Sequence, residues 1–460
     1  MKQLNCGLED SKIFNNYSEF KNLTYILFFY VLGLSILKIS FLGIIYSLFI
    51  IFIVYIFYKR YIYDFYIVTF FITEFYYINI GGGILRPYHF LTFLFIPFIL
   101  KNLKILIASK GIRIVCLFFT LSFMSTLLSD NLILGLKSLV LPIINFLIAI
   151  NLYLFLKTEK ITLKHLMKLQ VYIFFICLMF GYLQFIAFKL LKVNLALSKQ
   201  QLPQIFLGLI PSFRTESNTF GKFTAIFFPL IIILSNNKKN LKIQKLLIAG
   251  LIMLILNFTR SVMYPLFLII PILFKTMKIR LYKYLKILIS ISFIVMIFIV
   301  LKNLNILNIS EYGLYKISSF LDFEKISSDG SVSYRLDSIN ISLNNFLQSK
   351  KTILFGNGWG QSYGKLQGQI VQVGGNDFIS ILSFNGIIGF LVYIYMILFF
   401  LIKNFKLMRN SKIIDLKIFS IEVYYSFLIL ILISMSSGTL ISPEYWYIFG
   451  CLIFISDYKK

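Results

Sequence analysis

Continuous apolar runs of about 17 to 25 residues recur along the whole sequence, with short polar segments between them. Each run is long enough to cross a hydrocarbon core of roughly 30 Å as a helix. Transmembrane strands would instead alternate apolar and polar residues over about ten positions. With 59% hydrophobic and 14% charged residues, the chain falls outside soluble usage. We therefore expect an all-α, polytopic transmembrane helix bundle that forms a single integral membrane domain over residues 1–460.

The runs predict about fourteen spans, within a range of about 11 to 14. Their approximate bounds are 22–38, 39–58, 61–80, 84–100, 112–128, 132–156, 167–190, 216–236, 243–259, 261–275, 284–303, 376–402, 416–435 and 442–457.

Clusters of Lys and Arg predict the orientation of these spans, because short basic loops stay in the cytoplasm. An even number of expected spans separates each cluster from the next, so both termini are expected inside. The net charge of +27 is explained by these loops. It does not indicate a nucleic-acid partner, because the basic residues lie between spans and do not line one polar face.

One segment interrupts the pattern. Between Lys302 and Asn376 the chain is largely polar, and the orientation above makes residues 303–375 a long periplasmic loop inserted in the membrane domain. Within it, apolar residues recur every three to four positions, as in an amphipathic helix: Leu336, Ile339, Leu343, Phe346 and Leu347. Such a helix either lies on the outer bilayer surface or packs against the spans.

Arginine is rare in this chain, and four of its eight arginines are expected on the outer side: Arg86, Arg214, Arg260 and Arg335. This placement runs against the positive-inside bias, and a guanidinium near lipid is costly unless it is paired. Arg presents a planar fork of donors that matches phosphate oxygens. The four arginines therefore predict a site for a lipid diphosphate, with pairing to protein carboxylates or snorkelling to headgroups as the alternative for each.

Acidic residues near the same side are the candidates for a general base: Glu74, Glu216, Asp337 and Asp377. A carboxylate inside the membrane is a functional hypothesis by default, although pairing with a nearby arginine is the favoured role for each. A base would have to reach a sugar hydroxyl on the face opposite the departing diphosphate.

Other candidate residues give weaker signals. His89 is expected near the outer end of a span, either as a proton carrier or, more simply, as a hydrogen-bonded interfacial residue. The GNGWG stretch from Gly356 to Gly360 is expected to form a turn, with Trp359 stacked on a sugar or placed at the interface. Two histidines and four cysteines without a CxxC pair argue against a zinc site.

With these residues, the chain resembles the superfamily of bacterial O-antigen polymerases and O-antigen ligases. Four stretches carry the likeness: RTESNTFGKFTAIFFPLIIIL, with Arg214; NFTRSVMYPLFLII, with Arg260 and Ser261; YRLDSINISLNNFLQSKKTILFGNGWG, with Arg335, Gly356 and Gly358; and NDFISILSFNGIIGFL, with Asn376, Phe378, Gly386 and Gly389. Many members have His before the Asn of the last stretch, where this chain has Gly375. That difference favours a polymerase over a ligase.

The resemblance implies a glycosyltransferase of the bacterial inner membrane that moves a glycan chain from undecaprenyl diphosphate to another lipid-linked repeat unit on the periplasmic face. It implies no cofactor and no metal, because the diphosphate is already an activated leaving group. Its partners would be the undecaprenyl-diphosphate-linked oligosaccharide, membrane lipids, a chain-length regulator and a flippase. On this reading Arg214, Arg260 and Arg335 hold the diphosphate with help from Arg86, and Glu216 or Asp377 acts on the acceptor. An O-antigen ligase and a flippase for lipid-linked oligosaccharides are the alternatives.

Overall fold

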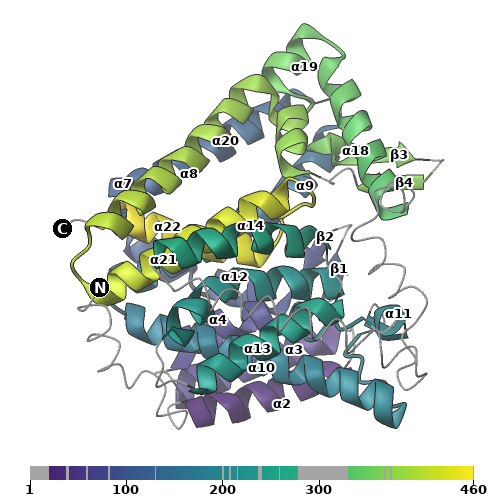
Figure 1. The fold of residues 1–460 in the computed structure, drawn as a ribbon. Coiled ribbons are helices and arrows are strands. Elements are labelled where there is room, and N and C mark those ends of the chain that lie inside the picture. Colours follow the sequence, from purple (N-terminus) through teal and green to yellow (C-terminus); the bar gives the residue numbers. More distant parts are fainter. Residues whose placement is uncertain are drawn as a thin grey trace.

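A computed structural model describes residues 20–37, 41–58, 61–80, 83–129, 131–198, 201–206, 209–214, 216–236, 241–257, 260–277, 330–366, 369–372 and 376–458. These residues are mainly helical, with two short antiparallel hairpins. Figure 1 shows the long helices packed side by side at different tilts, with both hairpins near one end of the bundle. The expected helical membrane protein is thus confirmed as a class.

Among the described residues, six helices are long and apolar enough to cross a membrane. They are α8 (Lys110–Leu127), α9 (Leu132–Lys157), α10 (Leu163–Leu191), α12 (Ser217–Ser235), α20 (Asp377–Asn410) and α21 (Ile414–Ser434). Shorter apolar helices accompany them, including α2 (Lys21–Leu37), α3 (Phe41–Phe57), α4 (Ile62–Ile72) and α14 (Arg260–Thr276). Helix α13 (Leu241–Asn257) packs on α10 and α12. A total of about fourteen spans stays a prediction.

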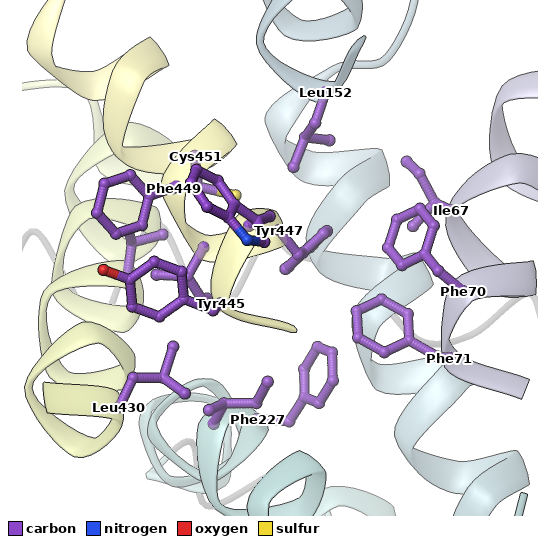
Figure 2. Packing of buried hydrophobic residues seen from close by; sticks show 14 of the residues in the cluster. Ile67, Phe70, Phe71, Leu152, Phe227, Leu430, Tyr445, Tyr447, Phe449 and Cys451 are labelled. Atoms are coloured by element: carbon purple, nitrogen blue, oxygen red, sulfur yellow. The ribbon is translucent and has the colours of Figure 1, made fainter. Parts of the chain in front are cut away.

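Helix α22 (Pro443–Ser456) is the centre of the bundle. It packs along α9 and also contacts α4, α8, α20 and α21, and every residue from Pro443 to Ile455 is buried. Aromatic side chains fill the space around it. In Figure 2, Phe70 and Phe71 of α4 face Tyr447 of α22 and Phe227 of α12, with ring centroids of Phe71 and Tyr447 5.2 Å apart.

The third and fourth apolar runs do not form the uninterrupted spans expected at 61–80 and 84–100. Helix α4 ends at Ile72 after 11 residues, a length of about 16 Å, too short to cross the hydrocarbon core alone. Strands β1 (Ile78–Ile80) and β2 (Gly83–Leu85) then form a hairpin, followed by three short helices, α5 (Pro87–Leu94), α6 (Ile96–Lys101) and α7 (Leu103–Ala108). Proline lies in the first turn of both α5 and α6, a position that starts a helix because proline has no N–H to bond to a preceding turn.

The expected span at 284–303 and the first part of the expected loop lie outside the described residues. The loop's second part contains helices α18 (Gly330–Leu347) and α19 (Lys350–Phe355), the short 3-10 helix η3 (Trp359–Ser362) and a hairpin of β3 (Tyr363–Leu366) and β4 (Gln369–Gln372). The periplasmic position of this segment stays a prediction.

Helix α18 confirms the helix expected from the apolar spacing, but only part of the expected apolar face is buried. It packs against α20, and its buried residues are Ser338, Ser342 and Phe346. Leu336 and Leu347 of the expected apolar face are 52% and 63% exposed. Small serine side chains allow close approach of two helices, so the helix packs against a span and leaves these leucines outward.

Helix α20 is broken at Gly386, whose φ of 63° lies in the left-handed region. The break leaves carbonyl groups of the preceding turn without helical partners. The GNGWG segment satisfies them: the Asn357 N–H donates to the Ser383 carbonyl and the Gly358 N–H to the Phe384 carbonyl, both at 2.9 Å. The sequence segment is therefore a turn, as expected, and its role is to dock on the kink of α20.

Trp359 does not stack on a sugar or lie at the interface. Its side chain is 4% exposed, its ring centroid lies 5.3 Å from that of Phe384, and its Nε1–H donates to Asn385 Oδ1 at 3.0 Å. The expectation was wrong because a tryptophan beside a Gly-rich turn can equally serve to anchor that turn in the core.

Candidate functional site

A group of four charged side chains, three of them buried and one half-buried, lies where several helix ends meet. The Arg214 guanidinium forms ion pairs with both Glu74 and Glu444, and Arg86 Nη2 lies 3.7 Å from Glu74 Oε1. Arg214 is 1% exposed. We refer to Glu74, Arg86, Arg214 and Glu444 as the arginine cluster. Its formal charges, two positive and two negative, balance.

The arginine cluster joins four segments that are separated in the sequence. Glu74 follows α4, Arg86 precedes α5, Arg214 precedes α12, and Glu444 lies in the first turn of α22. A backbone hydrogen bond of 3.2 Å from Phe75 N–H to the Phe213 carbonyl ties the first and third of these segments together. The cluster therefore fixes one end of the bundle.

A strained turn directs Arg214 into the protein. Ser212 has a φ of 53°, unusual for a residue other than glycine. Its conformation is held by neighbouring helices: its N–H donates to Gln184 Oε1 at 2.8 Å, and its hydroxyl donates to the Cys177 carbonyl at 2.7 Å. Gln201 Nε2 donates to the Arg214 carbonyl at 2.6 Å. Such over-determined strain is typical of functional sites.

Aromatic rings surround the Arg214 guanidinium. Its central carbon lies 4.8 Å from the ring centroid of Phe223 and 5.7 Å from that of Phe71. These distances are within the range of cation–π attraction, which is strengthened when water is excluded. Burial by itself disfavours the Glu74 carboxylate, but Arg214 and Arg86 outweigh that effect and hold the pKa of Glu74 below its ordinary value. Glu74, beyond the end of α4, is therefore ionised.

Three further polar residues adjoin the arginine cluster. Lys222, in the second turn of α12, donates to the Gly438 carbonyl at 3.1 Å. Next along the chain, Thr439 donates to Asp377 Oδ2 through both its N–H, at 2.7 Å, and its hydroxyl, at 2.6 Å. Lys222 is within electrostatic range of Asp377, Glu444 and Glu74. The cations and acids thus continue from α12 and α22 to the start of α20.

Arg335 approaches this group from α18. It is half-buried and acts electrostatically on Lys222. Two cations that repel one another are held at the same end of the bundle. Such an arrangement favours the binding of an anion between or beside them.

The structure brings together Glu74, Arg86, Arg214, Arg335 and Asp377 among the residues expected from the sequence. It separates others from them. Glu216 is exposed at the N-cap of α12, with no side-chain cap bond, and Asp337 is exposed on α18. Arg260 begins α14, but its side chain lies outside the described residues, as does Gly375.

Asn376 is the N-cap of α20, and His89 is the third residue of α5, where it forms a capping box with Arg86. His89 is fully buried, and its Nδ1 accepts from the Arg86 N–H at 3.1 Å at the start of α5, which leaves the ring proton on Nε2. Asn376 Oδ1 accepts from the N–H groups of Phe378 and Ile379 at the start of α20, and its amide donates to the Met435 carbonyl at 2.8 Å. Both side chains thus accept backbone hydrogen bonds in the first turn of a helix.

Sequence reasoning missed Glu444, Lys222 and Thr439. Glu444 carries a readable signal, since it is an acid within an apolar run at the expected outer end of the last span. Lys222 lies eight positions after Arg214 within the RTESNTFGKF stretch. Helical spacing alone does not show that it faces Gly438, because this contact depends on the packing of α12 against the segment before α22.

The opposite end of the bundle holds simpler pairs. His165 Nε2 lies 2.9 Å from both oxygens of Asp64, and Lys157 Nζ donates to the Asp457 carbonyl at 3.4 Å. These contacts join the ends of α4, α9, α10 and α22 away from the arginine cluster. Among the described residues, the larger buried group of charges is the one at the end where α18 lies.

The chemistry available to the arginine cluster and its neighbours is anion binding and proton transfer in a site shielded from water. Within the described ranges, no group of three or more His, Cys, Asp or Glu side chains is arranged to hold a metal ion. Comparison with protein-family models, curated proteins and solved structures finds no match to this chain.

Proposed function

We propose that the protein is a membrane-embedded glycosyltransferase that polymerises a surface polysaccharide. It would transfer a glycan from undecaprenyl diphosphate to another lipid-linked repeat unit, as the likeness to O-antigen polymerases implies. The reaction needs a site that holds a diphosphate, aligns an acceptor hydroxyl and excludes water. It needs no additional activation of the donor.

The observation that carries this proposal is the gathering of Arg86, Arg214, Lys222 and Arg335 with three carboxylates at one end of an apolar helix bundle. Buried or half-buried cations in a membrane protein mark sites for anions or for paired acids. A diphosphate on a polyprenyl chain combines an anion with an apolar tail, so its tail would stay in lipid while its charge reaches the cluster.

The contacts refine the roles expected from the sequence. Arg214 is engaged by both Glu74 and Glu444, so a diphosphate would have to displace a carboxylate to reach it. Lys222 and Arg335 are better suited to meet the phosphate first, since the bond that anchors Lys222 is to a carbonyl group. Asp377 is a better candidate than Glu216 for the acceptor-orienting group, because its neighbours are the cations themselves.

Substitution of Lys222 and Arg335 tests the proposal. Lys222→Gln and Arg335→Gln should each reduce glycan chain extension at least about tenfold, the effect of one lost charged contact of about 1.4 kcal/mol or more. Membrane insertion should be retained. The matched control is Arg113→Gln, an exposed arginine of α8. Normal polymer length in both variants would exclude this cation pair as the donor site.

The phenotype of a deletion strain separates the alternatives. Loss of a polymerase leaves single repeat units on the surface, loss of a ligase leaves unattached lipid-linked polymer, and loss of a flippase leaves no exported glycan. The long loop expected between Lys302 and Asn376, whose second part contains α18 and α19, favours an enzyme over a flippase, whose spans are usually joined by short loops. A ligase or flippase phenotype would overturn the proposal.

A further inference from the structure

A second carboxyl group is buried in the bundle, away from the arginine cluster. Glu422 is the ninth residue of α21, about 12 Å along the helix from its start, and is fully buried. Its Oε1 accepts a hydrogen bond of 2.7 Å from Gln170 Nε2 of α10. Within the described part of the chain it makes no ion pair.

Among the described residues, the surroundings of Glu422 offer no charge to balance an ionised carboxylate. Tyr447 and Cys451 of α22 face it, and both residue types are neutral at ordinary pH. Tyr447 also lies beside the Gln170 side chain and packs among the rings of α4 and α12 shown in Figure 2. An unpaired carboxylate in such a place is strongly disfavoured relative to the neutral acid.

Two oxygens of the Glu422 and Gln170 pair have no hydrogen-bond donor among the described residues: Glu422 Oε2 and Gln170 Oε1. Both are acceptors if the carboxyl group is ionised, so neither can satisfy the other. A proton on Oε2 removes the charge and turns that oxygen into a donor. The acid can then donate to the Gln170 carbonyl oxygen while it accepts from the Gln170 amide.

We propose that Glu422 is a proton-binding site within the membrane, where the bound proton closes a cyclic carboxylic acid–amide pair with Gln170 between α10 and α21. The proton satisfies both orphan oxygens at once, and it needs no further group. Release of the proton would break one hydrogen bond, leave a bare charge between apolar helices and require α10 and α21 to separate or admit water. The packing of α10 against α21 thus depends on whether Glu422 has bound a proton.

Infrared spectroscopy of the full chain in lipid nanodiscs tests this site at neutral pH. The carbonyl stretching band of a protonated carboxyl group should be present in the unmodified protein and should shift in D2O. Glu422→Gln should abolish the Glu422 contribution, whereas Glu444→Gln should leave it in place. Loss of a carboxylate band in E422Q, with the protonated band unchanged, would overturn the proposal.

A second variant keeps the test decisive if E422Q fails to insert. Gln170→Leu removes the amide but leaves the acid, so the protonated band should persist and move to higher frequency. If a carboxylate band replaced the protonated carboxyl band in Gln170→Leu, the proposal would be overturned. If Glu422 bound a cation in place of the proton, sodium should raise the thermal stability of the unmodified protein but not that of E422Q. That result would also overturn the proposal.

Discussion

Glu444 and Glu422 lie on adjoining helices, and both are buried glutamates, yet their environments differ completely. Glu444 faces Arg214 within a set of four balanced charges. Glu422 faces the amide of Gln170 among neutral side chains. The first region gains its stability from charges that depend on one another, and the second avoids charge. A buried acid therefore has to be interpreted from its partners, because burial alone does not determine its protonation.

The largest effect should come from removing the centre of the arginine cluster. Arg214→Ala would leave Glu74 and Glu444 buried together without their shared cation, and breaking a buried ion pair in this way typically costs about 3 to 5 kcal/mol. We expect loss of the folded protein, measured by thermal unfolding in detergent and by yield from membranes. Arg113→Ala, in exposed surroundings, should change stability by less than about 0.5 kcal/mol. Equal melting temperatures of Arg214→Ala and Arg113→Ala would contradict the role given to Arg214.

Glu444→Gln should have the next largest effect. The neutral amide leaves the cluster with one excess positive charge, and loss of a charge-assisted contact costs about 1.5 to 3 kcal/mol. A double-mutant cycle with Glu74→Gln measures the coupling, because both acids share Arg214. If the changes in the free energy of unfolding of the two substitutions were strictly additive, the four charges would not act as a unit.

The sequence predicts features that depend on neighbouring residues along the chain better than features that depend on contacts between helices. The span expected at 132–156 agrees to within a few residues with α9, which covers Leu132–Lys157, because a long apolar run can cross a membrane only as a helix. The run at 61–80 misleads because apolarity does not distinguish one long helix from a short helix followed by a hairpin. The scarcity of arginine correctly marks Arg86 and Arg214 as unusual.

The partners of those arginines are much harder to predict. Glu444 can be recognised as an acid within an apolar run, but an acid in the first turn of a helix normally indicates favourable interaction with the helix dipole, so this signal does not identify Arg214 as its partner. Glu422 lies in the middle of a span, whereas the expected site lies at the outer ends of the spans. Both contacts depend on how α22, α12, α10 and α21 pack, and single-sequence periodicity does not specify pairings between helices.

Acidification should distinguish the two regions by a smaller effect. The folded-state pKa of Glu74 lies below its ordinary value because Arg214 and Arg86 outweigh the effect of burial. The Glu74 carboxylate therefore contributes stability above the unfolded-state pKa, and this contribution is lost as pH falls through the folded-state pKa. The unmodified protein should lose stability in acid, on the order of 1 kcal/mol, measured as a fall in its melting temperature. In the same pH scan, the melting temperature of Glu74→Gln should be lower at neutral pH and should fall less in acid. Parallel curves for the two proteins would contradict the ionised state assigned to Glu74.

The smallest effect is expected at Glu422, where the proposed acid is uncharged. Glu422→Gln exchanges a protonated acid for an amide of nearly the same shape, and the new N–H can donate to Gln170 Oε1 in place of the acid O–H. Since hydrogen bonding is kept and no charge is lost, the free energy of unfolding should change by less than about 1 kcal/mol. The same chemical substitution at Glu444 is expected to cost more than that. If E422Q were instead as unstable as E444Q, Glu422 would have to be ionised in the folded protein, and an uncharged acid–amide pair between α10 and α21 could not account for its burial.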